Sequence, residues 1–81
     1  MMAILVTVDK IRTKNNLVTY SFSNELGKKG FFSVDSQTGE LLLTKPMPSD
    51  TSKRYFARAA RKVLIDWKEK GTLPEHTVWA S

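Results

Sequence analysis

The sequence predicts an α+β domain, in which a four-stranded antiparallel meander is followed by one C-terminal amphipathic helix packed on one sheet face. Three observations lead to this prediction. Apolar and polar residues alternate with a period of two through the first half of the chain, whereas residues 52–70 repeat their apolar positions with a helical period. Between these parts, Lys45-Pro46-Met47-Pro48 interrupts the sheet, because proline lacks the N–H that a central strand donates.

Strands are expected at about residues 3–12, 17–23, 30–35 and 40–44. A polar turn at residues 13–16 joins the first two strands. The last two strands are joined by a hairpin turn in which Gly39 can adopt the left-handed conformation. Alternation directs one apolar set toward the core, namely Ile4, Val6, Val8, Val18, Tyr20 and Phe22.

The helix is expected over residues 52–70. Ser49-Asp50-Thr51-Ser52 offers several oxygen atoms that can cap its N-terminus, while Gly71 and Pro74 end it. Residues 72–81 then form an extended tail. An advance of about 100° per residue gathers the helix's apolar side chains on one stripe, which we expect to be buried against the sheet: Phe56, Ala59, Ala60, Val63, Leu64 and Trp67.

A second apolar set falls on the sheet face opposite the helix, here called the outer face: Leu5, Leu17, Phe31 and Leu42. Because one helix covers only one face of a sheet, the outer face must meet water, the tail, a second subunit or a ligand. We expect the tail, through Val78 or Trp79, or a homodimer to cover it. Stacking of nucleic-acid bases is less favoured, since Phe31 is the only aromatic residue expected on that face.

The composition is that of one small folded domain covering residues 1–81, with 41% hydrophobic and 26% charged residues. The sequence contains no cysteine and no basic, long-apolar leader at Met1, so we expect a cytoplasmic protein without disulfides. No apolar run approaches the length that crosses a bilayer, and we therefore expect no membrane partner.

Residues that carry catalysis or bind metals are not grouped in the sequence. His76 is the only histidine, and the carboxylates of Asp9, Asp35, Asp50 and Asp66 are spread over a strand, a turn, a cap and the helix. A nucleophile needs a base within hydrogen-bond reach, and a metal ion needs several ligands together. We therefore expect no enzymatic activity, no cofactor and no metal site.

The polar side of the helix carries the main functional signal, because it is cationic over most of its width: Arg54, Arg58, Arg61, Lys62 and Lys68. Like charges four residues apart cost a helix a few tenths of a kcal/mol, so stability does not favour them. Ile65 lies in the middle of this arc, where we expect Glu69 as the one acidic neighbour. An apolar residue ringed by arginines is typical of a contact surface, whereas a face kept only for solubility is the alternative interpretation.

The basic surface is expected to extend beyond the helix. Strand ends alternate in a meander, so Lys28, Lys29 and Lys45 should gather where the helix begins, together with Lys53 and Arg54. Lys10, Arg12 and Lys14 should share one side of the first strand and form a second basic group at the opposite end.

Two hypotheses follow from a net charge of +5, which attracts polyanions and acidic protein faces alike. The leading one is a non-catalytic protein that binds nucleic acid, single-stranded DNA or RNA, through the helix cations, with Lys28, Lys29 and Lys45 extending the contact. The topology and charge are similar to those of single-strand-binding modules such as Whirly domains and PUR repeats, with no motif matched residue by residue. The alternative is a protein-interaction module of the inhibitor or immunity type, whose patch centred on Ile65 docks on an acidic partner.

Overall fold

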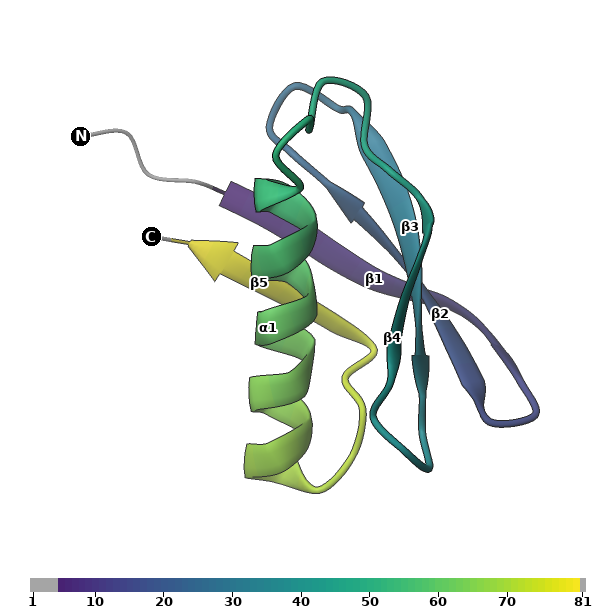
Figure 1. Ribbon diagram of the computed structural model, residues 1–81. Helices are drawn as coiled ribbons and strands as arrows, with labels where there is room; N and C mark the ends of the chain where they lie inside the picture. The colour runs from purple at the N-terminus through teal and green to yellow at the C-terminus, as the bar shows by residue number, and fades with distance from the viewer. Residues whose placement is uncertain (1–4, 81) are drawn as a thin grey trace.

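The computed structural model describes residues 5–80 and confirms the α+β architecture. Five antiparallel strands form one sheet in the order β4-β3-β2-β1-β5, and a single helix packs on one face of it (Figure 1). The elements are β1 (Leu5–Lys14), β2 (Leu17–Ser23), β3 (Lys29–Asp35), β4 (Leu41–Lys45), α1 (Arg54–Lys70) and β5 (His76–Ala80). Residues 3 and 4 of the first expected strand, including Ile4, lie outside the described residues.

The C-terminal segment differs from the expected extended tail, because residues 76–80 form strand β5 along the free edge of β1. Val6 lies opposite Trp79 and Thr7 opposite Val78 in this pairing. The connection is held by the Tyr20 hydroxyl, which donates a 2.7 Å hydrogen bond to the carbonyl oxygen of Pro74. The tail therefore widens the sheet instead of folding over its outer face, and Trp79 lies on the helix side.

The core lies between α1 and the sheet, on the face predicted by the alternation of residues. Phe22, Phe32 and Phe56 bring their rings together with centroids 5.7 to 6.1 Å apart, and Tyr20 stacks on Phe32 at 5.5 Å. Gly30 lets the chain pass close to this cluster, since a Cβ atom at that position would lie 2.5 Å from Phe22 Cζ. Such a contact is sterically forbidden, so the position requires glycine.

The helix begins at Arg54, two residues later than expected, and a residue of the expected capping segment, residues 49–52, caps its N-terminus. Lys53 occupies the N-cap position with a φ of 56° and makes no side-chain cap hydrogen bond. The cap is the buried carboxylate of Asp50, which accepts hydrogen bonds of 3.2 Å from the backbone N–H groups of Tyr55 and Phe56. Two of the otherwise unpaired N–H groups at the helix start are thereby satisfied.

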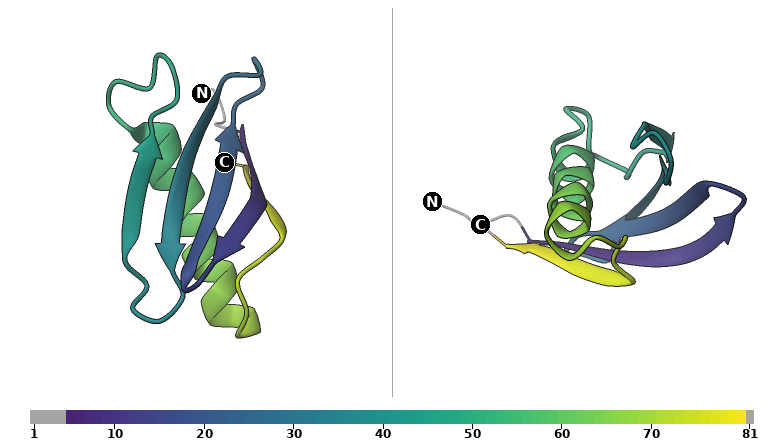
Figure 2. Two further views of the ribbon diagram at one scale, coloured as in Figure 1. Left: turned by 90° about the vertical axis from the view of Figure 1, so that its right-hand side faces the viewer. Right: turned by 90° about the horizontal axis from the view of Figure 1, so that it is seen from below.

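The helix lies mainly over β5 and β1, and β4 stands beside it (Figure 2). Its own residues Ala59, Ala60 and Val63 are buried on the side that faces the sheet, as expected. Trp67 was expected to be largely buried; it is partly buried and packs on the edge of the core, near the turn that holds Gly39. Among residues 5–80, no helix is both long enough and apolar enough to span a membrane.

Candidate functional site

Four cations project from α1 on the side away from the sheet, and with Ile65 they form what we call the α1 ridge: Arg54, Arg58, Arg61 and Lys68. Arg54, Arg61 and Lys68 are exposed, while Arg58 and Ile65 are partly buried. Within residues 5–80, none of the four cations forms an ion pair. The four positive charges of the ridge are therefore not paired within the described residues, although helical spacing places the carboxylate of Glu69 on the same side of α1.

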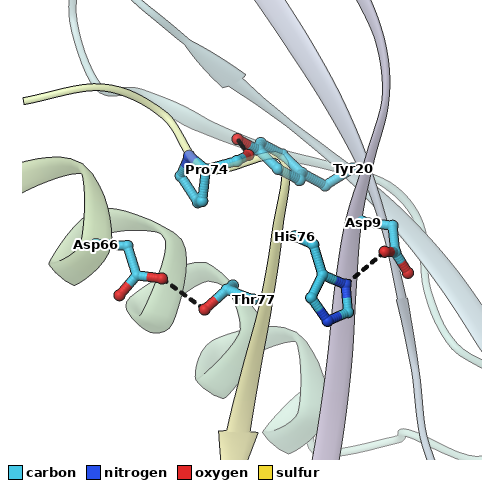
Figure 3. Close-up of polar contacts among 6 residues, drawn as sticks. All are labelled: Asp9, Tyr20, Asp66, Pro74, His76 and Thr77. Carbon is cyan, nitrogen blue, oxygen red and sulfur yellow. Dashed lines mark hydrogen bonds and ion pairs between the residues drawn. The ribbon is translucent and has the colours of Figure 1, made fainter. Parts of the chain in front are cut away.

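Lys62, the fifth cation expected on this surface, has a structural partner. Its ammonium lies 3.1 Å from Oδ1 of Asp66, whose other carboxylate oxygen accepts a 2.5 Å hydrogen bond from the Thr77 hydroxyl of β5 (Figure 3). The Thr77 hydrogen bond and the charge of Lys62 together hold the pKa of Asp66 below its ordinary value, despite burial. Glu69 was the one acidic neighbour expected on this surface, although the i, i+4 spacing of Lys62 and Asp66 could have revealed this pair.

An apolar groove of about 370 Å³ separates α1 from β4. Its apolar lining comes from Leu41, Phe56, Ala57, Ala60, Leu64 and Ile65, and Arg61 and Lys68 complete it. Leu64, expected in the buried stripe, is only partly buried because it faces this groove. A second hollow of about 320 Å³ lies on the β5 side of Ile65, bounded by Lys62 and Trp79. Ile65 thus stands between two hollows, neither of which is lined by an acidic residue.

The basic groups expected at the start of the helix are only partly brought together. Lys28 donates a 3.4 Å hydrogen bond to the hydroxyl of Ser49, which places the β2–β3 loop beside the segment that leads into α1. The side chain of Asn24 shapes that loop by accepting hydrogen bonds from the backbone N–H groups of Leu26 and Lys28. Lys29 and Lys45 instead lie on the outer face of the sheet, opposite Ser23 and Phe31 respectively.

Two β-bulges set the direction of cationic side chains at the outer face. In β1, Lys10 lies opposite the buried Tyr20, but the register then shifts and Arg12 lies opposite Thr19 on the outer face. The expected grouping of Lys10 with Arg12 and Lys14 is therefore wrong, because the bulge separates Lys10 from the other two. In β4, a shift at residue 44 places Lys45 opposite Phe31, also on the outer face.

Arg12 and Lys45 border a hollow of about 350 Å³ that crosses the outer face. The partly buried ring of Phe31 lies in it beside the hydroxyls of Thr19 and Ser33, whose oxygens are 3.1 Å apart. Ile11 and Thr44 complete the lining, which includes no carboxylate. Alternation predicts Phe31 on this face, but the bulge that brings Arg12 to it leaves no signal in the alternation of residues.

Much of the outer face stays uncovered by the chain itself. The exposed fractions are 39% for Leu5, 46% for Leu17 and 57% for Leu42, and Val78 reaches 37% although it belongs to β5. The expected covering by the tail is therefore wrong, whereas homodimerisation through this face stays a prediction.

Polar contacts elsewhere hold the structure together. Nδ1 of His76 lies 2.6 Å from Oδ1 of Asp9 across the β1–β5 pair, and both side chains are more than half exposed (Figure 3). Burial and, secondarily, the charge of Glu75 raise the pKa of Tyr20. Within residues 5–80, no three histidine or acidic side chains are grouped so as to hold a metal ion.

No protein-family model matches the chain, and the searches of curated proteins and of solved structures found no significant match either.

Proposed function

We propose that the chain is a small non-catalytic protein that binds nucleic acid, DNA or RNA, electrostatically through the α1 ridge. The observation that supports this proposal is that four cations lie on one helix face and form no ion pair within residues 5–80: Arg54, Arg58, Arg61 and Lys68. Repulsion between Arg54 and Arg58, four residues apart, costs the helix a few tenths of a kcal/mol. A phosphate backbone offsets that cost, because each cation it binds releases condensed counterions.

The basic surface continues from the ridge around one end of the molecule. Lys28 is held beside the residues that precede α1 by its hydrogen bond to Ser49. Lys29 and Lys45 follow on the outer face, next to Phe31. A flexible strand that follows the helix can therefore remain near cations as it passes around this end.

Salt dependence tests the proposal, with a labelled mixed-sequence single strand of about 20 nucleotides titrated by fluorescence anisotropy. If the four ridge cations each neutralise one phosphate, the slope of log affinity against log salt is about −2.8, and affinity falls about fifty-fold between about 50 and 200 mM salt. Absence of binding at the lower salt concentration contradicts the proposal.

Charge reversal locates the contact. The double variant Arg58→Glu/Arg61→Glu should abolish binding and leave the circular dichroism spectrum unchanged, since neither residue belongs to the buried stripe of α1. The matched control Lys10→Glu/Lys70→Glu changes the net charge equally but lies off the ridge, and it should reduce affinity only modestly. Equal losses in the two variants would mean that binding follows net charge alone.

A second candidate function is favoured by the apolar groove between α1 and β4. Side chains such as Leu41 and Leu64 line it, with Arg61 and Lys68 alongside, so it is complementary to an amphipathic helix that carries acidic residues around its apolar anchors. This is the protein-interaction alternative, in which the ridge supplies specificity for an acidic partner.

A designed peptide tests this alternative. Its leucines would be placed at helical positions i, i+4 and i+7 and its remaining positions filled largely with glutamate. On this alternative, the peptide should shift the methyl NMR signals of Leu41 and Leu64, and a lysine-rich version should not. Leu64→Asp should remove the interaction, whereas Leu42→Asp on the outer face should leave it intact.

A further inference from the structure

Two bulges in one small sheet bring cations to the same hollow. Strict alternation after Lys10 would return residue 12 to the helix side, and strict alternation after Leu43 would do the same for residue 45. Both register shifts prevent this outcome and place Arg12 and Lys45 on the outer face. Bulges recur beside binding sites because they redirect a side chain in this way.

The lining of the hollow offers three kinds of contact to one ligand. Phe31 supplies an aromatic ring, Thr19 and Ser33 supply a hydroxyl pair, and the two cations stand on opposite sides. Strands β1 and β4 are three strand spacings apart, a distance of about 14 Å across the sheet. The long side chains of Arg12 and Lys45 can therefore reach toward the centre of the hollow from both sides. A volume of about 350 Å³ lies at the lower end of the range for small-ligand sites.

We propose that this hollow holds one unpaired nucleotide of a single-stranded nucleic acid, with its base stacked on Phe31 and its flanking phosphates bound by Arg12 and Lys45. The proposal rests on the nucleic-acid function proposed above and adds a preference for single strands to it. A base inside a duplex is already stacked between its neighbours, so only an unpaired base can lie against the Phe31 ring.

The site is continuous with the basic surface that leads to α1. Lys29 lies two residues before Phe31 on the same strand and therefore on the same face, opposite Ser23. The adjacent Lys28 contacts Ser49, just before the helix. One strand can thus pass from the α1 ridge, around this end of the sheet, to the hollow.

The experiment compares two strands that differ only in their bases. The probes are a thymidine 15-mer and an abasic strand with the same number of phosphates. Stacking of one base predicts that the wild-type protein binds the thymidine strand about 5- to 150-fold more tightly than the abasic strand. Phe31→Ala should make the two affinities equal, Phe31→Tyr should keep the preference, and Leu42→Ala, on the same face outside the hollow, should also keep it.

The outcomes separate this inference from the general function. If wild-type protein binds neither strand at low salt, nucleic-acid binding itself is wrong and the inference falls with it. If wild type binds both strands equally and Phe31→Ala changes neither affinity, the ridge function stands and the nucleotide site is wrong.

A second pair of variants keeps the test informative if Phe31→Ala does not fold. Arg12 and Lys10 lie on either side of the bulge and point to opposite faces. Arg12→Gln should make the salt slope for the thymidine strand shallower by about 0.7, the loss of one phosphate contact. Lys10→Gln should leave the slope unchanged. Equal slopes in all three proteins contradict the phosphate contact at Arg12.

Sedimentation decides between a ligand and a second copy of the chain on the outer face. We expect the complex with the thymidine strand to leave this face free of protein–protein contact, so Leu42→Asp should not change its mass. A dimer that persists with the strand bound and is dissociated by Leu42→Asp would cover the hollow and overturn the proposal.

Discussion

The Thr77 hydroxyl donates a 2.5 Å hydrogen bond to Oδ2 of Asp66, and this contact joins the C-terminal strand to the helix. Both residues are buried, with exposed fractions of 6% each. Lys62 binds the other carboxylate oxygen at 3.1 Å, so the buried charge is paired as well as hydrogen-bonded. The contact fixes β5 against α1, in addition to the strand pairing that holds β5 against β1.

Thr77→Val should therefore destabilise the fold by about 1 to 3 kcal/mol, because it removes a hydrogen bond to a buried charged group while preserving side-chain shape. Urea denaturation measures the change. Thr7→Val, a threonine on the outer face of the neighbouring strand, is the matched control and should change stability by less than about 0.5 kcal/mol. Equal effects of the two substitutions would mean that the hydrogen bond contributes nothing beyond general strand packing.

Acid should weaken the fold through the same carboxylate. The Thr77 hydrogen bond and the nearby charges of Lys62 and Lys70 lower the folded-state pKa of Asp66 below the ordinary value of 3.8. The unfolded state therefore binds the proton more readily, so this stabilisation is complete above about pH 5 and is lost as the pH falls through the lowered pKa.

Asp66→Asn measures that contribution. Its stability deficit relative to wild type should be largest near neutral pH and should shrink below about pH 4, as Asp66 of the wild type becomes protonated. Denaturation midpoints across a pH series provide the comparison. Glu69→Gln, which removes an exposed negative charge from the same helix, is the control for net charge. A deficit of Asp66→Asn that does not vary with pH would contradict the assigned role of Asp66.

The helix cap gives a third prediction, which compares Asp50 with Ser52. Both residues carry a side-chain oxygen that could cap the helix, and the sequence alone does not separate them. Asp50→Ala removes the acceptor of the Tyr55 and Phe56 N–H groups and should cost about 0.5 to 2 kcal/mol. Ser52→Ala, at the position expected to start the helix, removes a side chain that is exposed and should cost less than about 0.5 kcal/mol. Thermal denaturation of both variants checks the assignment, and a larger loss from Ser52→Ala would refute it.

The strands of the meander could be predicted to within about one residue for β2, β3 and β4, because side-chain alternation reports directly which face is buried. Strand β5 could not, since His76–Ala80 is short and its partner β1 lies at the other end of the chain. The α1 ridge follows from helical spacing alone. The Phe31 hollow depends on two bulges. No residue in the run Lys10-Ile11-Arg12 indicates that the strand register shifts there, so the bulge could not be predicted from the sequence.

Ile65 provides the comparison that separates the two proposed functions. It is the apolar residue of the α1 ridge, it lies between the groove on the β4 side and the hollow beside Trp79, and it is partly buried. If phosphates bind the surrounding cations, Ile65→Asp acts only through its added negative charge. The loss in affinity for a single strand should then not exceed that of Arg61→Gln, which changes the net charge by the same amount.

If the ridge instead docks on an acidic protein, Ile65 becomes the buried centre of the contact, and its replacement by aspartate should cost about 2 kcal/mol or more, roughly thirty-fold in affinity. The same two variants, Ile65→Asp and Arg61→Gln, are therefore titrated with the labelled single strand and with the acidic amphipathic peptide. A loss at Ile65 that far exceeds the loss at Arg61 for the peptide, together with no binding of the strand by wild type, assigns the surface to a protein partner. Comparable losses at the two positions for the strand, with no response to the peptide, assign it to nucleic acid, because a phosphate backbone responds to charge and not to the apolar side chain between the cations.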